Sequence, residues 1–194
     1  SNLSEVFKLP NKTYSVVFPG VNLDFFLPYR HTKSTSGFTV CFMGHLTEVK
    51  GADIVFDLAA KLDPVKFKVI AGISPGEKNL AFANKLLLRT DELHNLEYIG
   101  FCEDPISYLS ECDLLILPYR SGNTVLGVAQ SAIEAMCMGI PVLATSNSAV
   151  NDIVSHGENG YLLDTFNELE QCVLNLIGDA KLHKKLSDNA RMTV

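Results

Sequence analysis

Short apolar runs alternate with longer amphipathic segments along most of this chain, and no other feature of the sequence restricts its fold as much. The runs carry few charges and are rich in β-branched or aromatic residues, which is typical of strands buried on both faces. The predicted strands are Phe38–Met43, Phe67–Ala71, Leu96–Ile99, Asp113–Tyr119, Pro141–Thr145 and Gly160–Leu163. The predicted helices are Ala52–Leu62, Lys78–Leu88, Pro105–Ser110, Gly127–Met138, Ala149–Val154, Phe166–Gly178 and Lys181–Arg191.

Strands that alternate with helices in this way pair in parallel, because each helix returns the chain to the same end of the sheet. The nearly continuous apolar strands require helices on both faces. The sequence therefore predicts an α/β fold with a parallel sheet and helices on both faces. Such sheets bind ligands outside the carboxyl ends of their strands, near the point where the strand order reverses.

The first 36 residues depart from this pattern. They hold an additional predicted strand, Tyr14–Phe18, and the beginning of a polar linker, Tyr29–Gly37. We therefore divide the chain into a segment of one strand and a polar linker, residues 1–36, and one domain, residues 37–194. The length of 194 residues and the apolar content of 47% are sufficient for a domain with a full hydrophobic core.

Composition excludes several classes of function. A formal net charge of −6 offers no basic footprint for nucleic acid, although a local basic pocket could still bind one phosphate ligand. The most apolar stretch, Val128–Thr145, contains Gln130 and Glu134, so no transmembrane segment is predicted. The polar first residues show no signal-peptide pattern. Five cysteines without a CxxC pair indicate reduced thiols in a cytoplasmic protein.

A glycine-containing turn, Gly44–Gly51, follows the first strand of the predicted sheet, and a helix begins after it. Gly44 permits a ligand to approach the backbone, and the helix N-terminus supplies N–H groups that have no partner within the helix. His45 and Lys50 could then bind a phosphate group. Because the turn matches neither a GxGxxG nor a Walker pattern, an ordinary turn with a solvated lysine is the alternative interpretation.

The segment Gly127–Met138 is apolar at nearly every position, so its helix is predicted to be buried on most sides. Gln130 and Glu134 are four residues apart and share one face of that helix. A carboxylate in such surroundings must be paired, hydrogen-bonded or directed into a cavity. The pair is suited to ribose or sugar hydroxyls. A structural glutamate that holds a backbone group or an arginine is the alternative.

A third candidate site, Gly100-Phe101-Cys102, follows the strand Leu96–Ile99. It could present backbone groups and an aromatic face to a nucleobase, although the side chain of Phe101 itself is expected in the core. The histidines outside the glycine-containing turn, His183 among them, show no metal-ligand spacing and are interpreted as surface residues. No metal site is predicted.

Taken in order, these pieces resemble the C-terminal half of a GT-B glycosyltransferase of the retaining family 4 type. The most specific piece runs from Glu134 to Thr145 and resembles the family pattern E-A-M-A-x-G-x-P-V-[IV]-A-[ST]. The resemblance covers about residues 15 to 191. The other matching pieces are Pro19-Gly20-Val21-Asn22-Leu23 with Phe26 and Pro28, Gly44-His45-Leu46 with Lys50-Gly51, Tyr98-Ile99-Gly100-Phe101 with Asp104, Asp113-Leu114 with Leu117-Pro118, Asp152-Ile153-Val154, and Gly157-Glu158-Asn159-Gly160.

The resemblance implies a Rossmann-like domain, one half of a GT-B architecture, that binds a nucleotide-diphosphate sugar. Glu134 would bind the ribose hydroxyls, and Phe101 and Cys102 would border the base. The N–H groups of Gly127 and Val128 would meet the phosphate and the sugar. The implied site residues are Lys50 and His45, which would stabilise the diphosphate as catalytic residues, and the substrate-binding residues Gly44, Phe101, Cys102, Gly127, Val128, Gln130 and Glu134.

The resemblance also implies that no metal or other cofactor takes part, because fixed positive groups and helix N-termini stabilise the departing diphosphate. The acceptor would bind to an N-terminal domain that this chain lacks, so the chain alone is expected to bind nucleotide without transferring sugar. Such enzymes serve polysaccharide or glycolipid synthesis. We expect the enzyme in the cytoplasm, with the acceptor domain as its means of reaching the inner face of a membrane.

Two positions depart from the family pattern. Leu126 stands eight residues before Glu134, where the family has its first glutamate, and His45 stands where arginine is usual. An aliphatic side chain cannot replace the hydrogen bonds of a carboxylate, and histidine is fully charged only below about pH 6.5. The alternative function is therefore a nucleotide-sugar-binding or regulatory domain without transfer activity. A response-regulator-like module would need an acidic cluster where Gly44 and His45 stand.

Overall fold

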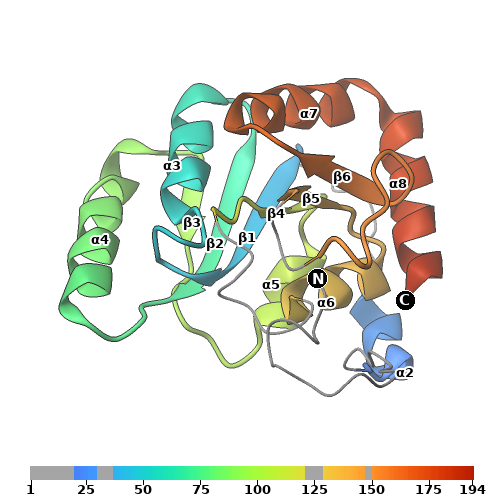
Figure 1. Cartoon of the computed structure of the whole chain (residues 1–194), viewed down its shortest axis with the longest axis horizontal. Coiled ribbons are helices and arrows are strands. Elements are labelled where there is room, and N and C mark those ends of the chain that lie inside the picture. The colour runs from blue at the N-terminus through green and yellow to red at the C-terminus, as the bar shows by residue number, and fades with distance from the viewer. Residues whose placement is uncertain (1–19, 30–36, 121–128, 147–149) are drawn as a thin grey trace, which may run out of the picture.

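The computed structural model describes residues 20–29, 37–120, 129–146 and 150–194. Its centre is one sheet of six parallel strands in the order β3-β2-β1-β4-β5-β6 (Figure 1). The predicted parallel sheet is confirmed, and each predicted apolar run overlaps one strand, although β1 extends to include Gly44 and His45, which were predicted to lie in the turn. The strands are β1 (Thr39–His45), β2 (Lys66–Gly72), β3 (Leu96–Tyr98), β4 (Leu114–Leu117), β5 (Val142–Thr145) and β6 (Gly160–Leu163).

Helices cover both faces of this sheet, as the sequence predicts (Figure 1). The helices are α2 (Leu23–Phe26), α3 (Ala52–Lys61), α4 (Glu77–Leu87), α5 (Pro105–Ser110), α6 (Gln130–Met138), α7 (Phe166–Gly178) and α8 (Ala180–Thr193), with the 3₁₀ turns η1 (Leu27–Tyr29) and η2 (Thr90–Glu92). Side chains of α3, α4 and α7 form the core on one face, and those of α2, α5 and α6 form the core on the other. Helix α8 reaches both cores, through Leu186 and Ala190.

The strands lie in the interior because their alternate side chains enter different cores. On β1, Val40 and Phe42 belong to the core beneath α3, whereas Cys41 belongs to the core beneath α6, and all three are fully buried. Each large apolar side chain removed from water in this way contributes roughly 1.5–3 kcal/mol. This two-sided burial explains why the strands appear in the sequence as continuous apolar runs instead of alternating patterns.

Helix α6 is shorter than the predicted helix Gly127–Met138. It begins at Gln130 because Ala129 is extended, with a ψ of 116°. Gly127 and Val128 lie outside the described residues. Helix α6 ends at Gly139, whose φ of 80° permits the left-handed turn that leads into β5.

The predicted helix Ala149–Val154 is wrong over its described part. Residues 150–153 form a turn, in which the N–H groups of Ile153 and Val154 both donate to the carbonyl of Val150. The side chain of Asn159 donates to the Ile153 carbonyl at 2.9 Å, so that carbonyl is already taken where a longer helix would need it. The predicted strand Tyr14–Phe18 lies outside the described residues.

His183 is buried, so the surface position predicted for it is wrong. Its Nε2 lies 2.7 Å from the carbonyl oxygen of Asp113, and its ring packs edge-on against Phe38. The carboxylate of Asp113 in turn accepts a hydrogen bond from the N–H of Thr39 at 2.8 Å. These contacts tie α8 to the amino ends of β1 and β4. They lie at the end of the sheet opposite the predicted ligand site.

The described part of the N-terminal segment packs against the rest of the molecule. The side chain of Asn22 caps α2 by accepting the N–H of Asp24 at 3.1 Å. Phe26 is buried in the core to which α6 also contributes, and α2 contacts α6. The division of the chain at residue 36 stays a prediction.

The strand order reverses between β1 and β4, and the loops that follow these two strands meet closely. Gly51, just before α3, has a φ of 66°. A Cβ on Gly51 would lie 2.0 Å from the carbonyl oxygen of Pro118, which follows β4. Only glycine fits both the conformation and the space. The contact holds the turn that follows β1 and ends at Gly51 against the segment after β4.

We expect Gly51→Ala to destabilise the fold by more than about 3 kcal/mol, because the added methyl group would overlap the Pro118 carbonyl and alanine disfavours a positive φ. Gly157→Ala is the matched control, since Gly157 has a φ of 77° but open space around its Cβ. That control measures the conformational penalty alone, roughly 1–2 kcal/mol. Urea unfolding measures both variants, and equal losses would contradict the close approach at Gly51.

Candidate functional site

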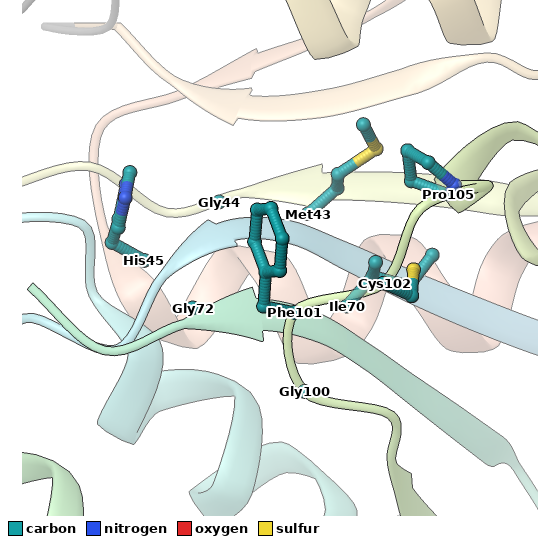
Figure 2. Close-up of a pocket in the computed structure, with 9 residues that line it drawn as sticks. All are labelled: Met43, Gly44, His45, Ile70, Gly72, Gly100, Phe101, Cys102 and Pro105. Carbon is teal, nitrogen blue, oxygen red and sulfur yellow. The ribbon is translucent and has the colours of Figure 1, made fainter.

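A pocket of ≈ 200 Å³ opens at the carboxyl ends of β1, β2 and β3. Because these strands are parallel, the residues that end or follow them come to the same edge of the sheet. The structure thereby brings together Gly44, His45, Phe101 and Cys102, which belong to two separate sequence motifs. The residues that line the pocket are Met43, Gly44, His45, Ile70, Gly72, Gly100, Phe101, Cys102 and Pro105 (Figure 2).

Gly72, the last residue of β2, lies between two rings. A Cβ on Gly72 would be 3.8 Å from Cδ2 of His45 and 3.9 Å from Cδ2 of Phe101. Figure 2 shows both rings projecting to the same side of the strand ends. His45 is the register partner of Gly72, so the pairing of β1 with β2 fixes one wall of this notch. The absence of a side chain at Gly72 keeps the notch open.

The side chain of Phe101 is 89% exposed, so its predicted place in the core is wrong. Gly100 has a φ of 78°, which turns the chain away from the sheet directly after β3. Tyr98 takes the inner position, and its hydroxyl donates to the carbonyl of Ala71 at 2.9 Å. An exposed phenylalanine beside a pocket leaves a flat apolar face available to a ligand.

The backbone of residues 100–102 is also available. The hydrogen-bonded ladder between β2 and β3 ends where the N–H of Ile99 donates to the carbonyl of Val69 at 3.0 Å. Within the described chain, the N–H and carbonyl groups of residues 100–102 make no further hydrogen bond. They can therefore donate to and accept from a ligand in the pocket.

Lys50 lies at the point where the strand order reverses. Its Nζ stands 3.9 Å from the ring centroid of Tyr119, the second residue after β4. Burial raises the pKa of Tyr119 to about 12, so the ring is neutral, and a hydrogen bond to Ser131 joins it to the first turn of α6. Burial also lowers the pKa of Lys50. Lys50 forms no ion pair with the residues that the structure describes.

Arg120 is the important residue of this region that sequence reasoning missed. Its guanidinium makes two parallel hydrogen bonds to the Asp53 carboxylate, at 2.7 and 2.6 Å, and a third to the carbonyl of Glu48 at 2.7 Å. A basic residue directly after the strand where the sheet order reverses was the available signal. Arg120 is already bound to the protein, which leaves the role of free cation to Lys50.

Gln130 and Glu134 share one face of α6, as predicted, and their side chains are hydrogen-bonded. Burial raises the pKa of Glu134, and the bond to Gln130 opposes that shift. The Oε2 atom of Glu134 is buried and has no hydrogen-bond partner among the described residues. Tyr119 connects α6 to Lys50, because its hydroxyl interacts with Ser131 in the first turn of α6 and its ring lies beneath the Lys50 ammonium. The glutamate therefore keeps an acceptor oxygen free beside the switch point.

Other chemistry finds less support in the described part of the chain. No group of three or more His, Cys, Asp or Glu side chains there could hold a metal ion. No helix there has both the length and the apolar character needed to cross a membrane. The five cysteines are free thiols, and Cys102 is the one that lines the pocket.

Comparison with known proteins assigns the family. The family described as "Glycosyl transferases group 1" matches residues 27–193, and the chain therefore belongs to the group 1 glycosyltransferases. An uncharacterized glycosyltransferase of Methanocaldococcus jannaschii is 28% identical over 180 residues, which are 91% of this chain and 47% of that protein. D-inositol 3-phosphate glycosyltransferase of Mycobacterium sp. (strain KMS) is 31% identical over 161 residues, 77% of this chain and 35% of that protein. The chain thus spans less than half the length of these relatives.

A solved structure confirms the predicted fold class. The crystal structure of Anabaena HepE in complex with UDP and glucose superposes on this chain with a TM-score of 0.77 at 20% sequence identity. The match covers 92% of this chain and 51% of that one. This chain is accordingly a Rossmann-like half of a GT-B architecture.

We expect Glu134→Gln to stabilise the fold at pH 7 by about 1 kcal/mol, because it removes a partly buried negative charge that has no cationic partner among the described residues. The raised pKa means that the folded protein takes up a proton at Glu134 at a higher pH than the unfolded chain does. The parent protein should therefore regain this stability as pH falls through the raised pKa, and the difference between the two proteins should narrow. Urea unfolding from pH 7 to 4.5 tests this. A difference that widens toward low pH would contradict it.

Proposed function

We propose that this chain is the donor-binding domain of a glycosyltransferase and that Lys50 binds the diphosphate of a nucleotide sugar. The observation that carries the proposal is the half-buried ammonium of Lys50, which has no anionic partner among the described residues. A partly desolvated charge is unfavourable unless a ligand supplies the opposite charge. Lys50 also lies at the reversal of strand order, where sheets of this type bind their ligands.

The pocket beside Gly72 would receive the nucleobase. The exposed ring of Phe101 offers a stacking surface, and the backbone of residues 100–102 offers both donors and acceptors. Gly72 leaves room for a planar group at the base of the pocket. The presence of UDP in the structure of Anabaena HepE makes a uridine nucleotide the first ligand to test.

Glu134 and Gln130 would bind the ribose. A ribose hydroxyl is both a donor and an acceptor, and the unpartnered Oε2 of Glu134 can accept from it. The amide of Gln130, which favours the ionised form of Glu134, would help to hold the carboxylate in place before the ligand arrives. Such an arrangement needs no reorganisation of the helix on binding.

The chemistry proposed for the complete enzyme breaks the bond between the anomeric carbon of the donor sugar and the diphosphate. Negative charge develops on the departing diphosphate, and the Lys50 ammonium would stabilise it from a fixed position. His45, at the end of β1, would add a second hydrogen bond. Following the family resemblance, we propose transfer without a metal ion or other cofactor and with retention of configuration. The roles of Gly127 and Val128 toward phosphate and sugar remain part of this proposal.

The acceptor would bind to an N-terminal domain, so the chain alone is proposed to bind donor nucleotides without turnover. The complete enzyme would serve polysaccharide or glycolipid synthesis. Leu126, in place of the family's first glutamate, supports one alternative, a nucleotide-sugar-binding domain that regulates without transferring sugar. Release of sugar from a UDP-sugar by the full-length enzyme in the presence of acceptor would exclude that alternative.

A thermal-shift screen tests the proposal directly. A ligand that binds only the folded chain raises its melting temperature by mass action. We expect nucleoside diphosphates and their sugars to raise the melting temperature of the chain, and uridine and sugar phosphates to do so less. No shift with any nucleoside diphosphate up to millimolar concentration would refute the proposed function.

We expect Lys50→Ala to weaken UDP binding by about 1.5–3 kcal/mol, the usual worth of a charged hydrogen bond. Because burial lowers the pKa of Lys50, the parent should lose affinity at a lower pH than an ordinary lysine with a pKa of about 10.4 would. The ligand phosphates are fully ionised above about pH 8, and the same titration with ADP, whose base does not ionise between pH 8 and 10, separates the lysine from ionisation of the uracil ring. Calorimetric titration measures both effects. Lys50→Ala should show no such pH dependence, and a variant that binds like the parent would exclude Lys50 from the site.

Gly72→Ala tests the nucleobase pocket. Its Cβ would make only ordinary contacts at 3.8 to 4.0 Å, so the fold should be unaffected. The methyl group would nevertheless fill the notch between His45 and Phe101, and we expect UDP affinity to fall about fivefold to tenfold with little change for inorganic pyrophosphate. Calorimetric titration with UDP and with pyrophosphate separates the contribution of the base to the affinity from that of the phosphates. Gly178→Ala, where the added Cβ meets nothing within 4 Å, is the control. Equal losses for UDP and pyrophosphate would contradict this placement of the base.

A further inference from the structure

Arg120 joins three loops at the ligand-binding end of the sheet. Its side chain bonds to Asp53 and to the Glu48 carbonyl, and its backbone N–H donates to the carbonyl of Val49 at 2.9 Å. The guanidinium carbon also lies 5.6 Å from the ring centroid of Phe166, at the start of α7. The bond to Asp53 is the first cause of the raised pKa of Arg120. Its hydrogen-bonding groups thus point to the protein and not to the ligand pocket.

Asp53 and Lys50 would otherwise be natural partners. They are three residues apart, and they contact consecutive residues of the segment after β4. Lys50 stands over Tyr119, and Asp53 is bound to Arg120. We expect that an Asp53 carboxylate without its arginine would attract the ammonium of Lys50, three residues earlier in the chain.

We propose that Arg120 is a positioning residue that occupies Asp53 and thereby keeps Lys50 unpaired and available to a diphosphate. The inference rests on the proposed function of Lys50 and adds a separate requirement, that the competing carboxylate be neutralised from within the protein. The planar guanidinium suits this task because it satisfies both oxygens of the carboxylate at once. The Lys50 ammonium then contacts the neutral ring of Tyr119. It can move from that ring to a diphosphate without breaking an ion pair to a described residue.

The same helix offers a matched control one turn further on. Asp57 pairs with Arg89 at 2.8 Å, and the carbon of that guanidinium lies 5.8 Å from the ring of Phe56. The two pairs have the same composition, but only the pair of Arg120 adjoins the lysine. If such ion pairs affected binding only by stabilising the fold, loss of either arginine should lower UDP affinity.

The experiment is a set of calorimetric titrations with UDP at pH 7.5. We expect Arg120→Met to lower the affinity about tenfold, because Asp53 then captures Lys50. The double variant Arg120→Met with Asp53→Asn should recover to within about threefold of the parent, since the competing charge is gone. Arg120→Lys, which keeps a positive charge opposite Asp53, should retain most of the affinity. Arg89→Met should bind like the parent.

Two results would overturn the proposal. One is unchanged affinity in Arg120→Met. The other is a loss in Arg120→Met that Asp53→Asn does not restore, or restores only along with a lowered melting temperature, because removing an unpaired carboxylate can also repair the fold. The melting temperature of each variant shows whether the fold is kept. If Arg120→Met does not fold, Arg120→Gln, which keeps a hydrogen-bond donor for Asp53 but no charge, takes its place with the same expected loss and the same rescue by Asp53→Asn.

A second measurement separates this proposal from the proposed function. Brief acetylation with acetic anhydride across pH 7 to 11, read by mass spectrometry, gives the pH at which the Lys50 amine becomes reactive, with exposed Lys78 as the reference. Pairing with Asp53 should move that midpoint upward by about one pH unit in Arg120→Met and back in the double variant. If the chain binds no nucleotide but the midpoint moves as expected, only the proposed function fails. If nucleotide binds and the midpoint stays fixed, only the role of Arg120 fails.

Discussion

The close approach of Gly51 to the Pro118 carbonyl is the constraint on which the ligand-binding end of this molecule depends. It brings the turn after β1 into contact with the segment after β4, across the point where the strand order reverses. Lys50 and Asp53 flank Gly51, and Tyr119 and Arg120 follow Pro118, so one backbone contact sets both side-chain pairs face to face. Any larger residue at position 51 would separate the loops and the pairs together.

The electrostatic potential at this end of the sheet depends on the side chains nearby and not on the net charge of the chain. The chain carries a formal charge of −6, and Glu48, Asp53 and Asp57 all act on the guanidinium of Arg120. An anionic ligand would be repelled by these carboxylates if they were unpaired. Two of them are paired with arginines, and the ammonium that remains stands over a neutral ring. A single lysine can therefore define a site for an anion on an acidic protein.

Most of the fold could be predicted from the sequence, because parallel strands buried on both faces leave continuous apolar runs between helical segments. The errors came from backbone chemistry that residue type does not reveal. The positive φ of Gly100 turned Phe101 outward, and the side chain of Asn159 took the carbonyl of Ile153 that a helix there would have needed. His183 was predicted at the surface because two lysines follow it, yet its Nε2 atom contacts the carbonyl of Asp113, just before β4.

Less of the candidate site could be predicted, because its parts come together only through the sheet. The sequence analysis placed His45 with Lys50 in one turn and Glu134 with Gln130 on one helix, and the parallel register then joined His45 with Gly72 and Phe101 in one pocket. Arg120 was missed because its role depends on Asp53, which lies 67 residues away in the sequence. Long-range pairs of this kind leave no periodic signal.

The features that lower the stability of this molecule gather at the same end of the sheet. Phe101 exposes its ring, and among the described residues Lys50 is partly removed from water without an anion and Oε2 of Glu134 is buried without a donor. The opposite end shows the reverse arrangement, since Asp113 binds the N–H of Thr39 and His183 lies against the Asp113 carbonyl. Proteins tolerate unsatisfied groups where a ligand will satisfy them. One ligand that carries a planar base, hydroxyl groups and a diphosphate would meet all three needs, whereas three unrelated ligands would each meet only one. The shared location therefore supports the proposal that a single nucleotide binds across the end of the sheet from β3 to α6.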